Sequence, residues 1–360
     1  MITRRDVCKG FFATCLPSLV SAAGVDFAPT VLGDGWPVGT PSSAGLDPDA
    51  LARLTQLIDA GLNMQNVHAL MIEHQGRLVF ERYWPGEDYR FTSSLGYVEH
   101  DATTLHDIRS ISKSVTSLLL GIALGDTAQD ALVRPITSFF PERRGLAGKM
   151  HAVTLHHVLT MTAGLAWNET IIPYDSERND FGQLIDSDDP VGFVLAKEVS
   201  DAPGTRWNYN SGLTDITAAI VEQLTGMQFT DFAEDVLFGP LGITDYEWYR
   251  PSTWPKDSIP GASWGLRLRG RDLAKIGSVV LHNGQWQGRQ IVPEEWVVAS
   301  TARQFDDLGG RYGYGYFWFP GALPGGTQVI MASGYGDQRI FVLPEQELTI
   351  TILAGNYGDG

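Results

Sequence analysis

Apolar residues recur along this chain at two spacings, and each spacing predicts a different kind of element. After Asp47, which can cap a helix, and Pro48, which suits a first turn, leucine and isoleucine recur every three to four residues as far as residue 62. That period predicts an amphipathic surface helix. From Val67 to Trp84, residues with high β propensity flank a His-Gln-Gly-Arg segment. This second pattern predicts a β-hairpin.

The middle of the chain, from about residue 104 to residue 300, has mostly helical spacing, and strand-like runs return only near the end. Helices are expected at 110–124, 155–161, 191–196, 214–225, 229–237, 270–283 and 293–301. Strands are expected at 312–319, 327–331, 339–343 and 348–353, with the last two joined across residues 344–347.

Strands at both ends of the chain and helices between them indicate an α+β fold. We expect one antiparallel sheet made from N- and C-terminal strands, flanked by helices, with a mostly helical lobe inserted between them. The α/β lobe would comprise about residues 40–125 and 265–357, and the helical lobe about residues 126–264. An active site is expected where the two lobes meet.

The composition is that of a large globular protein, and the charge narrows the choice of partners. The chain has 360 residues, of which 43% are hydrophobic and 19% charged, and its formal net charge is −16. This charge repels phosphate backbones and anionic membrane surfaces, so nucleic acid is not expected as a partner. We expect a small molecule as the partner, and no cofactor.

The first residues have the pattern of an export signal. Arg4 and Arg5 form a twin arginine that precedes a small and apolar run ending at Gly24. We therefore expect a twin-arginine signal over residues 1–23 and an exported, periplasmic mature chain over residues 24–360. The apolar run is too short to span a membrane. Both cysteines lie within the expected signal, which excludes disulfides and thiolate chemistry from the mature chain.

Ser110 and Lys113 form an S-x-x-K motif at the start of an apolar helix. A spacing of three residues puts both side chains on one helical face. A serine hydroxyl becomes a strong nucleophile when a base takes its proton, and a lysine amine can do so when burial lowers its pKa. The apolar helix provides that burial, and the positive end of its dipole favours an oxyanion beside Ser110. The structural alternative is a helix cap at Ser110 and a solvated Lys113.

Two further segments contain groups that could take part in catalysis. Tyr209 lies in a loop before the next helix, in a Tyr-Asn-Ser triplet that ends at Ser211. A phenol held near a lysine cation has a depressed pKa, so it can act as general base and then return the proton to the leaving group. Gly334, Tyr335 and Gly336 lie in a β-rich segment, where glycine allows close backbone approach and an N–H group can face an oxyanion. An aromatic loop anchor and a plain glycine turn are the alternatives.

In this order, the three segments resemble the serine β-lactamase and penicillin-binding superfamily, which uses an S-x-x-K motif, a tyrosine or serine motif and a K-T-G-like strand. The class C-like branch fits best. The runs His106–Ser114, Leu159–Trp167 and Tyr209–Ser211 look like the 6-aminohexanoate-dimer hydrolase group and related esterases. The resemblance covers roughly residues 40–357.

The resemblance implies a β-lactamase-like fold and a serine hydrolase that cleaves small esters or linear amides through an acyl-enzyme. Ser110 would be the acylated nucleophile, and Lys113 and Tyr209 would share the acid and base work. The amides of Ser110 and of the strand around Gly336 would form the oxyanion hole. The alternatives are a penicillin-binding protein or D-Ala peptidase, a β-lactamase-like protein, and a sensor that acylates and turns over slowly.

Three departures from the family pattern bear on the substrate and on the fold. Ser211 stands where many relatives have Asn, and Ala332 and Ser333 stand where true β-lactamases have Lys and Thr. A cationic group that binds a carboxylate is therefore missing at that strand, and efficient β-lactam hydrolysis is not expected. The family fold usually ends in a helix packed on the sheet, and this sequence stops at Gly360, just after the last expected strand.

The polar loop between Trp167 and Pro190 is a further candidate for substrate binding. In amide-hydrolysing relatives a loop here contributes to the substrate pocket, so Tyr174 or a carboxylate of this loop is a candidate contact for a substrate amine. The alternative is a solvated acidic loop.

Two other motifs would indicate an α/β-hydrolase nucleophile or a zinc site, but neither has the context that such a site needs. Gly261–Gly265 match the G-x-S-x-G nucleophile elbow, but residues of loop composition stand where that motif needs a strand. His156 and His157 are adjacent, so they cannot share one helix face as zinc ligands. The H-E-x-x-H pattern does not occur, and no metal site is expected.

Overall fold

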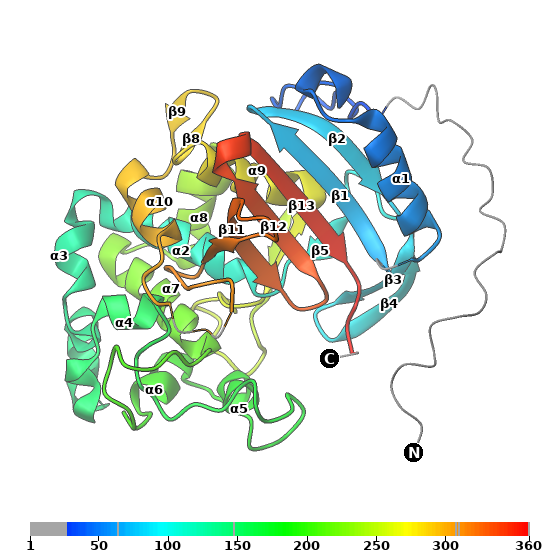
Figure 1. Cartoon of the computed structure of the whole chain (residues 1–360). Helices are drawn as coiled ribbons and strands as arrows, with labels where there is room; N and C mark the ends of the chain where they lie inside the picture. Colours follow the sequence, from blue (N-terminus) through cyan, green and yellow to red (C-terminus); the bar gives the residue numbers. More distant parts are fainter. Residues whose placement is uncertain (1–26, 63–64, 147, 307, 309, 359–360) are drawn as a thin grey trace, which may run out of the picture.

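A six-stranded antiparallel sheet, built from both ends of the chain, organises the fold (Figure 1). The computed structural model describes residues 27–62, 65–146, 148–306, 308 and 310–358, so the expected export signal and both cysteines lie outside the described residues. The strands are β1 (Val67–His74), β2 (Arg77–Tyr83), β10 (Phe319–Ala322), β11 (Gln328–Gly334), β12 (Gln338–Leu343) and β13 (Leu348–Ala354). Their order is β10-β11-β12-β13-β1-β2, so the first strand pairs with the last. The expected sheet and the expected hairpin are confirmed.

Helices cover both faces of this sheet. On one face lies α1 (Pro48–Asp59), which begins at Asp47, whose side chain accepts a hydrogen bond from the backbone N–H of Asp49. Leu70 and Ile72 of β1 pack in the core beneath this helix. Met71, which points the other way, belongs to the larger core, and α9 (Gly270–Leu281) packs against β1, β12 and β13 on that side. The two-residue alternation of a strand thus separates two cores.

The remaining helices lie beside the sheet (Figure 1). They are α2 (Ile111–Leu124), α3 (Ala128–Leu132), α4 (Leu155–Leu159), α5 (Asp180–Asp186), α6 (Pro190–Leu195), α7 (Ser211–Thr225), α8 (Phe229–Ala233) and α10 (Glu294–Thr301). The α2 and α7 helices pack on each other, and both are buried along most of their length. Across the described ranges, no helix combines the length and apolar character needed to cross a membrane.

The prediction that strands return only near the end of the chain was wrong. Seven short strands lie earlier in the described chain, among them β3 (Gly86–Arg90), β4 (Ser93–Val98), β5 (Leu105–Asp107), β6 (Tyr246–Trp248) and β7 (Leu266–Arg269). β3 pairs with β4, and β7 lies between β5 and β6. A strand of three or four residues offers too few positions for a two-residue period to stand out, and β3 and β4 are mostly polar or glycine.

The strand expected at 312–319 was also wrong, because the sheet there begins only at Phe319. Tyr312 and Tyr314 form isolated bridges to Gly321 and Phe305 instead. Phe317 has a φ of +65°, a left-handed conformation that interrupts an extended strand. A small two-stranded ribbon, β8 (Gln285–Trp286) with β9 (Arg289–Gln290), completes the described strands.

Candidate active site

Ser110 lies at the N-terminus of α2, on a backbone held in a strained conformation. Arg109, the residue before it, has a φ of +50°. An L residue rarely adopts this region, and such strain costs about 1–3 kcal/mol and persists only where neighbouring contacts enforce it. Here the Arg109 guanidinium lies 3.1 Å from the carboxylate of Asp107, and the Arg267 guanidinium lies 2.8 Å from the same carboxylate. These ion pairs fix the turn that presents Ser110.

The three side chains singled out in the sequence meet at the Ser110 hydroxyl. Tyr209 donates its phenolic hydrogen to Ser110 Oγ over 2.8 Å, and Lys113 Nζ lies 3.2 Å from the same oxygen. Lys113 Nζ also lies 4.8 Å from the centroid of the Tyr209 ring. Lys113 is only 2% exposed, whereas Ser110 is half-buried. The hydroxyl of this half-buried serine is therefore in contact with both a buried amine and a phenol.

Burial shifts the pKa values of the two ionisable partners of Ser110 in opposite directions. It lowers the pKa of the Lys113 amine, because charge is costly away from water, although the nearby Glu169 and Asp215 act the other way. Burial raises the pKa of Tyr209 above its usual range, and the Glu169 charge adds to this effect. The depressed phenol pKa expected from the sequence was therefore wrong. Lys113 is the group prepared to accept a proton, and Tyr209 is a neutral donor.

The amine of Lys113 is held by a segment that the sequence suggested for another role. Ser263 accepts a hydrogen bond from Lys113 Nζ over 2.8 Å through its backbone carbonyl. Its own N–H and hydroxyl donate to the Asp215 carboxylate over 3.0 and 3.3 Å. Ser263 is fully buried in a loop ahead of β7, so the G-x-S-x-G run does not present a nucleophile.

The sequence analysis missed Asp215, although its position among apolar and small residues of a helix could have indicated a functional carboxylate. It is the only acidic residue in the first eleven positions of α7, all of which are buried. Its carboxylate orients Ser263, and the Ser263 carbonyl in turn orients Lys113. Burial raises the pKa of Asp215, while the Lys113 charge lowers it. Asp215 and Lys113 therefore form a buried acid–base pair behind the nucleophile.

Glu169, also missed, joins the polar loop to the start of α7. Its buried carboxylate accepts hydrogen bonds from Trp167 Nε1 over 2.9 Å and from the backbone N–H of Ser211 over 2.7 Å. It also accepts from the Ser211 hydroxyl over 2.6 Å and from the Tyr174 hydroxyl over 3.4 Å. Ser211, proposed as a substrate contact, thus points its hydroxyl into this buried network. The ring of Tyr174 remains largely exposed.

The glycine-rich end of β11 lies against the turn that carries Ser110. A Cβ atom added to Gly334 would lie 2.4 Å from the backbone oxygen of Ile108. Gly334 is therefore required by the close approach of two backbone segments. Gly336, with a φ of +85°, packs against the ring of Tyr357, and the side chain of Tyr335 is exposed. The strand thus borders the nucleophile from the sheet side.

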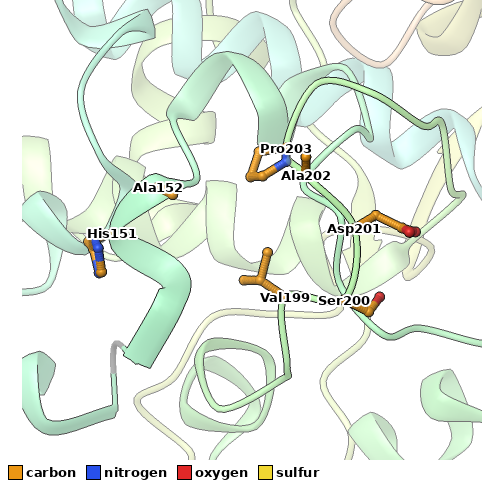
Figure 2. Close-up of a pocket in the computed structure, with 7 residues that line it drawn as sticks. All are labelled: His151, Ala152, Val199, Ser200, Asp201, Ala202 and Pro203. Carbon is orange, nitrogen blue, oxygen red and sulfur yellow. The ribbon is translucent and has the colours of Figure 1, made fainter.

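A hollow in the helical lobe is separate from this cluster. Figure 2 shows it between residues 151–152 and residues 199–203, with an internal volume of about 350 Å³. Ser110, Lys113 and Tyr209 are not among the residues that line it. The geometry therefore favours the Ser110 cluster as the candidate active site.

Comparison with known proteins identifies the family. A family model described as Beta-lactamase matches residues 54–357. This chain belongs to the beta-lactamase family. The confirmed family membership agrees with the resemblance inferred from the S-x-x-K, Tyr209 and Gly334 segments.

Two proteins with curated names show partial similarity to this chain. The 6-aminohexanoate-dimer hydrolase of Paenarthrobacter ureafaciens is 27% identical over 55% of this chain and 50% of its own length. Esterase EstB of Burkholderia gladioli is 28% identical over 57% of this chain and 55% of its own length. The matches thus span about half the length of these curated relatives.

A solved structure of a class C beta-lactamase mutant supports the fold. It has a TM-score of 0.61 and 17% sequence identity, and the alignment covers 86% of this chain and 92% of that one. At this identity the likeness shows the fold alone. It agrees with the class C-like arrangement expected from the sequence.

This member of the beta-lactamase family differs from the lactam-cleaving pattern on β11. Ala332 is fully buried, and Ser333 is opposite Arg339 of β12. The Arg339 guanidinium donates to the Gly334 carbonyl and to the Asp337 carboxylate, over 3.0 Å in each case. This cation is therefore paired with groups at the turn between β11 and β12.

Proposed function

We propose that this protein is a serine hydrolase that cleaves small esters or linear amides through an acyl-enzyme on Ser110. The observation that carries the proposal is the pair of contacts at Ser110 Oγ, 2.8 Å from the Tyr209 hydroxyl and 3.2 Å from Lys113 Nζ. Acyl transfer requires a nucleophile with a base and a proton donor close by, and here the buried amine and the neutral phenol each lie within hydrogen-bond reach of the Ser110 hydroxyl.

Acylation follows from the protonation states of these groups. The unprotonated Lys113 amine accepts the proton of Ser110 as Oγ forms a bond to the acyl carbon. The amide of Ser110, at the positive end of α2, stabilises the oxyanion together with the edge of β11 near Gly336. The bond to the leaving oxygen or nitrogen then breaks as Tyr209 gives it a proton, and Tyr209 is reprotonated from Lys113. The products are a Ser110 ester and a free alcohol or amine.

Deacylation reverses the same sequence with water in place of the leaving group. Water attacks the Ser110 ester while its proton passes through Tyr209 to Lys113. The acyl–Oγ bond breaks, and Ser110 recovers its proton from Lys113. The carboxylic acid leaves, and the resting site is restored.

The pairing of cations near Ser110 favours substrates without a carboxylate beside the scissile bond. Arg339 is held by Asp337, and Ala332 and Ser333 provide no positive charge. The names of the two curated relatives, one a 6-aminohexanoate-dimer hydrolase and one an esterase, support the same substrate classes. Tyr174, exposed at the rim, is proposed to contact the acyl or amine portion.

Residues 1–23 are proposed to direct export of the folded chain to the periplasm. The twin arginine at positions 4 and 5 and the small residues before Gly24 support this proposal. N-terminal sequencing of the protein recovered from a periplasmic fraction tests it. A first residue at or near Gly24 is expected, and an intact Arg4–Arg5 segment in the cytoplasmic fraction alone contradicts it.

A serine-directed fluorophosphonate probe and a substrate panel test the hydrolase proposal. Mass spectrometry should find the probe on the peptide that contains Ser110 and should find none on it in Ser110→Ala. Ser263→Ala is the matched control, because it removes the serine of the G-x-S-x-G run but keeps the carbonyl that holds Lys113. Its labelled residue should still be Ser110. Label on Ser263 in the wild type would overturn the assignment of the nucleophile.

The panel compares short p-nitrophenyl esters, 6-aminohexanoate oligomers, D-Ala dipeptides and nitrocefin. Turnover of the esters or the linear amides is expected, with loss of turnover in Ser110→Ala. Preferential turnover of nitrocefin or of D-Ala dipeptides would contradict the substrate assignment. A stable acyl adduct on Ser110 without turnover would identify a slow sensor instead.

A further inference from the structure

Three histidines and an aspartate meet in a buried cluster at one end of the sheet, outside the candidate active site. His68 lies on β1, Asp88 on β3, His100 in the loop between β4 and β5, and His106 on β5. One ligand atom of each lies within 4.8 Å of the others. Their side chains are 0 to 4% exposed. The sequence analysis missed this cluster, because its members come from separate elements and form no spacing motif.

The hydrogen bonds around the cluster fix the outward nitrogens of two histidines as donors. His100 Nδ1 lies 3.0 Å from the backbone oxygen of Trp84, and His106 Nδ1 lies 3.0 Å from the backbone oxygen of Asp107. A carbonyl oxygen can only accept, so each of these nitrogens carries the hydrogen of its ring. In the neutral form of each ring, the opposite nitrogen therefore presents a lone pair to the inside of the cluster.

The same reasoning applies to the third histidine. His68 Nε2 lies 3.1 Å from Asn66 Oδ1, and the amide orientation of Asn66 is set because its Nδ2 donates to the backbone oxygen of Glu87 over 3.0 Å. His68 Nε2 is therefore the donor, and His68 Nδ1 faces the inside with a lone pair. Gly86 and Gly355 make room for this pair, since a Cβ atom on either would lie 2.7 Å or less from Asn66 or His68.

Four acceptors thus converge on one buried point. His68 Nδ1 and His106 Nε2 are 2.8 Å apart, and His100 Nε2 is 3.3 Å from Asp88 Oδ2. Asp88 Oδ1 is 3.4 Å from His106 Nε2 and 3.9 Å from His68 Nδ1. Lone pairs at these separations repel one another in a buried site unless a cation lies among them.

The chemistry of the acceptors suits a tetrahedral metal ion, and their separations of 2.8, 3.3, 3.4 and 3.9 Å lie around the spacing that such a site needs. Zinc bonds to nitrogen and oxygen at about 2.0–2.2 Å, which places neighbouring ligands of a tetrahedron about 3.3–3.6 Å apart. Imidazole nitrogens suit zinc, whereas Mg²⁺ and Ca²⁺ prefer oxygen ligands. Each histidine also donates its outer N–H to an oxygen, the arrangement that orients metal-bound imidazoles.

We propose that His68, Asp88, His100 and His106 bind one Zn²⁺ ion in a closed structural site. Four protein ligands fill a tetrahedron, and the burial of all four excludes substrate, so the ion has no open position for catalysis. The ion would join β1 of the main sheet to β3, to the loop before β5 and to β5 itself. Since Ser110 follows His106 by four residues, the site also anchors the strand that leads to the nucleophile.

Metal analysis of the full chain, purified without a polyhistidine tag, tests the proposal. Elemental analysis should find about one zinc per chain. After removal of the metal with a chelator, Zn²⁺ should raise the melting temperature, and Co²⁺ should give the visible absorption of a tetrahedral site. Absence of zinc together with no response to Zn²⁺ or Co²⁺ would overturn the proposal and assign the cluster a shared proton.

Two histidine variants locate the ion. His100→Ala removes one ligand from the loop, and its Zn²⁺ affinity should fall by more than the roughly 10–100-fold that loss of an outer hydrogen-bond partner typically costs. His74→Ala, at the far end of β1, is the control and should retain wild-type affinity. Equal affinity in His100→Ala would refute the site. If His100→Ala does not fold, the Zn²⁺ and Co²⁺ titrations of the wild-type chain decide the question. None of these measurements depends on hydrolase activity.

Discussion

The Tyr209→Phe variant removes one hydroxyl group and leaves the rest of the candidate site in place. The ring of Tyr209 lies 6.0 Å from that of Trp207 and beside Lys113 Nζ, and phenylalanine can keep both contacts. The 2.8 Å hydrogen bond to Ser110 Oγ is lost. Lys113 still lies 3.2 Å from the same oxygen, so the base remains available while the proton donor to the leaving group does not.

The size of the effect follows from the role of the hydroxyl. General acid–base groups typically contribute about 10²–10⁴-fold to a rate, which corresponds to about 2.7–5.4 kcal/mol of transition-state stabilisation. The net contribution of one hydrogen bond to folding is only about 0.5–1.5 kcal/mol. Tyr209→Phe should therefore lower kcat by about two orders of magnitude or more and change the free energy of unfolding little. The fall in kcat should be larger for amide substrates than for activated esters, because an amine leaving group must be protonated as it departs.

Steady-state kinetics with a p-nitrophenyl ester and a linear amide, together with chemical denaturation, measure both effects. Tyr316→Phe is the control. It also removes a tyrosine hydroxyl, but that hydroxyl is hydrogen-bonded to His156 over 3.1 Å and not to Ser110. A kcat for Tyr209→Phe within about tenfold of the wild-type value on the amide would refute the donor role. Equal losses in the two variants would point to a general packing effect.

Two further predictions concern the groups behind the nucleophile. Since burial lowers the pKa of Lys113 to about 8 and only the unprotonated amine accepts a proton, kcat/KM should rise with pH and level off above about pH 8. A profile that is flat below pH 8 would contradict the base role. Glu169→Gln replaces a carboxylate that accepts from Ser211 and Trp167, so it should lower the free energy of unfolding by about 1–3 kcal/mol in a denaturant titration. Glu177→Gln, on the exposed part of the same loop, should leave stability unchanged; an equal loss there would refute the special role of Glu169.

The sequence by itself determined the features that depend on neighbours a few residues apart. The cap at Asp47, the hairpin around residue 75 and the seven expected helices all correspond to observed elements, because caps and apolar periods act within one or two turns. Ser110 and Lys113 lie on one helix face for the same reason. The order of the three motifs was specific enough to indicate the family.

The tertiary structure decided which distant groups meet and how their environment changes them. Tyr209 and Ser263 reach the Ser110–Lys113 pair from 99 and 150 residues away. Asp215 reaches the pair through Ser263, and Glu169 lies near it because the polar loop packs against the start of α7. The pKa of Tyr209 is raised rather than depressed, since burial and the Glu169 charge outweigh the hydrogen bond to Ser110. The His68 cluster likewise exists only where four separate segments converge. Desolvation and long-range contacts are properties of the packed chain, so no local pattern of residues could have supplied them.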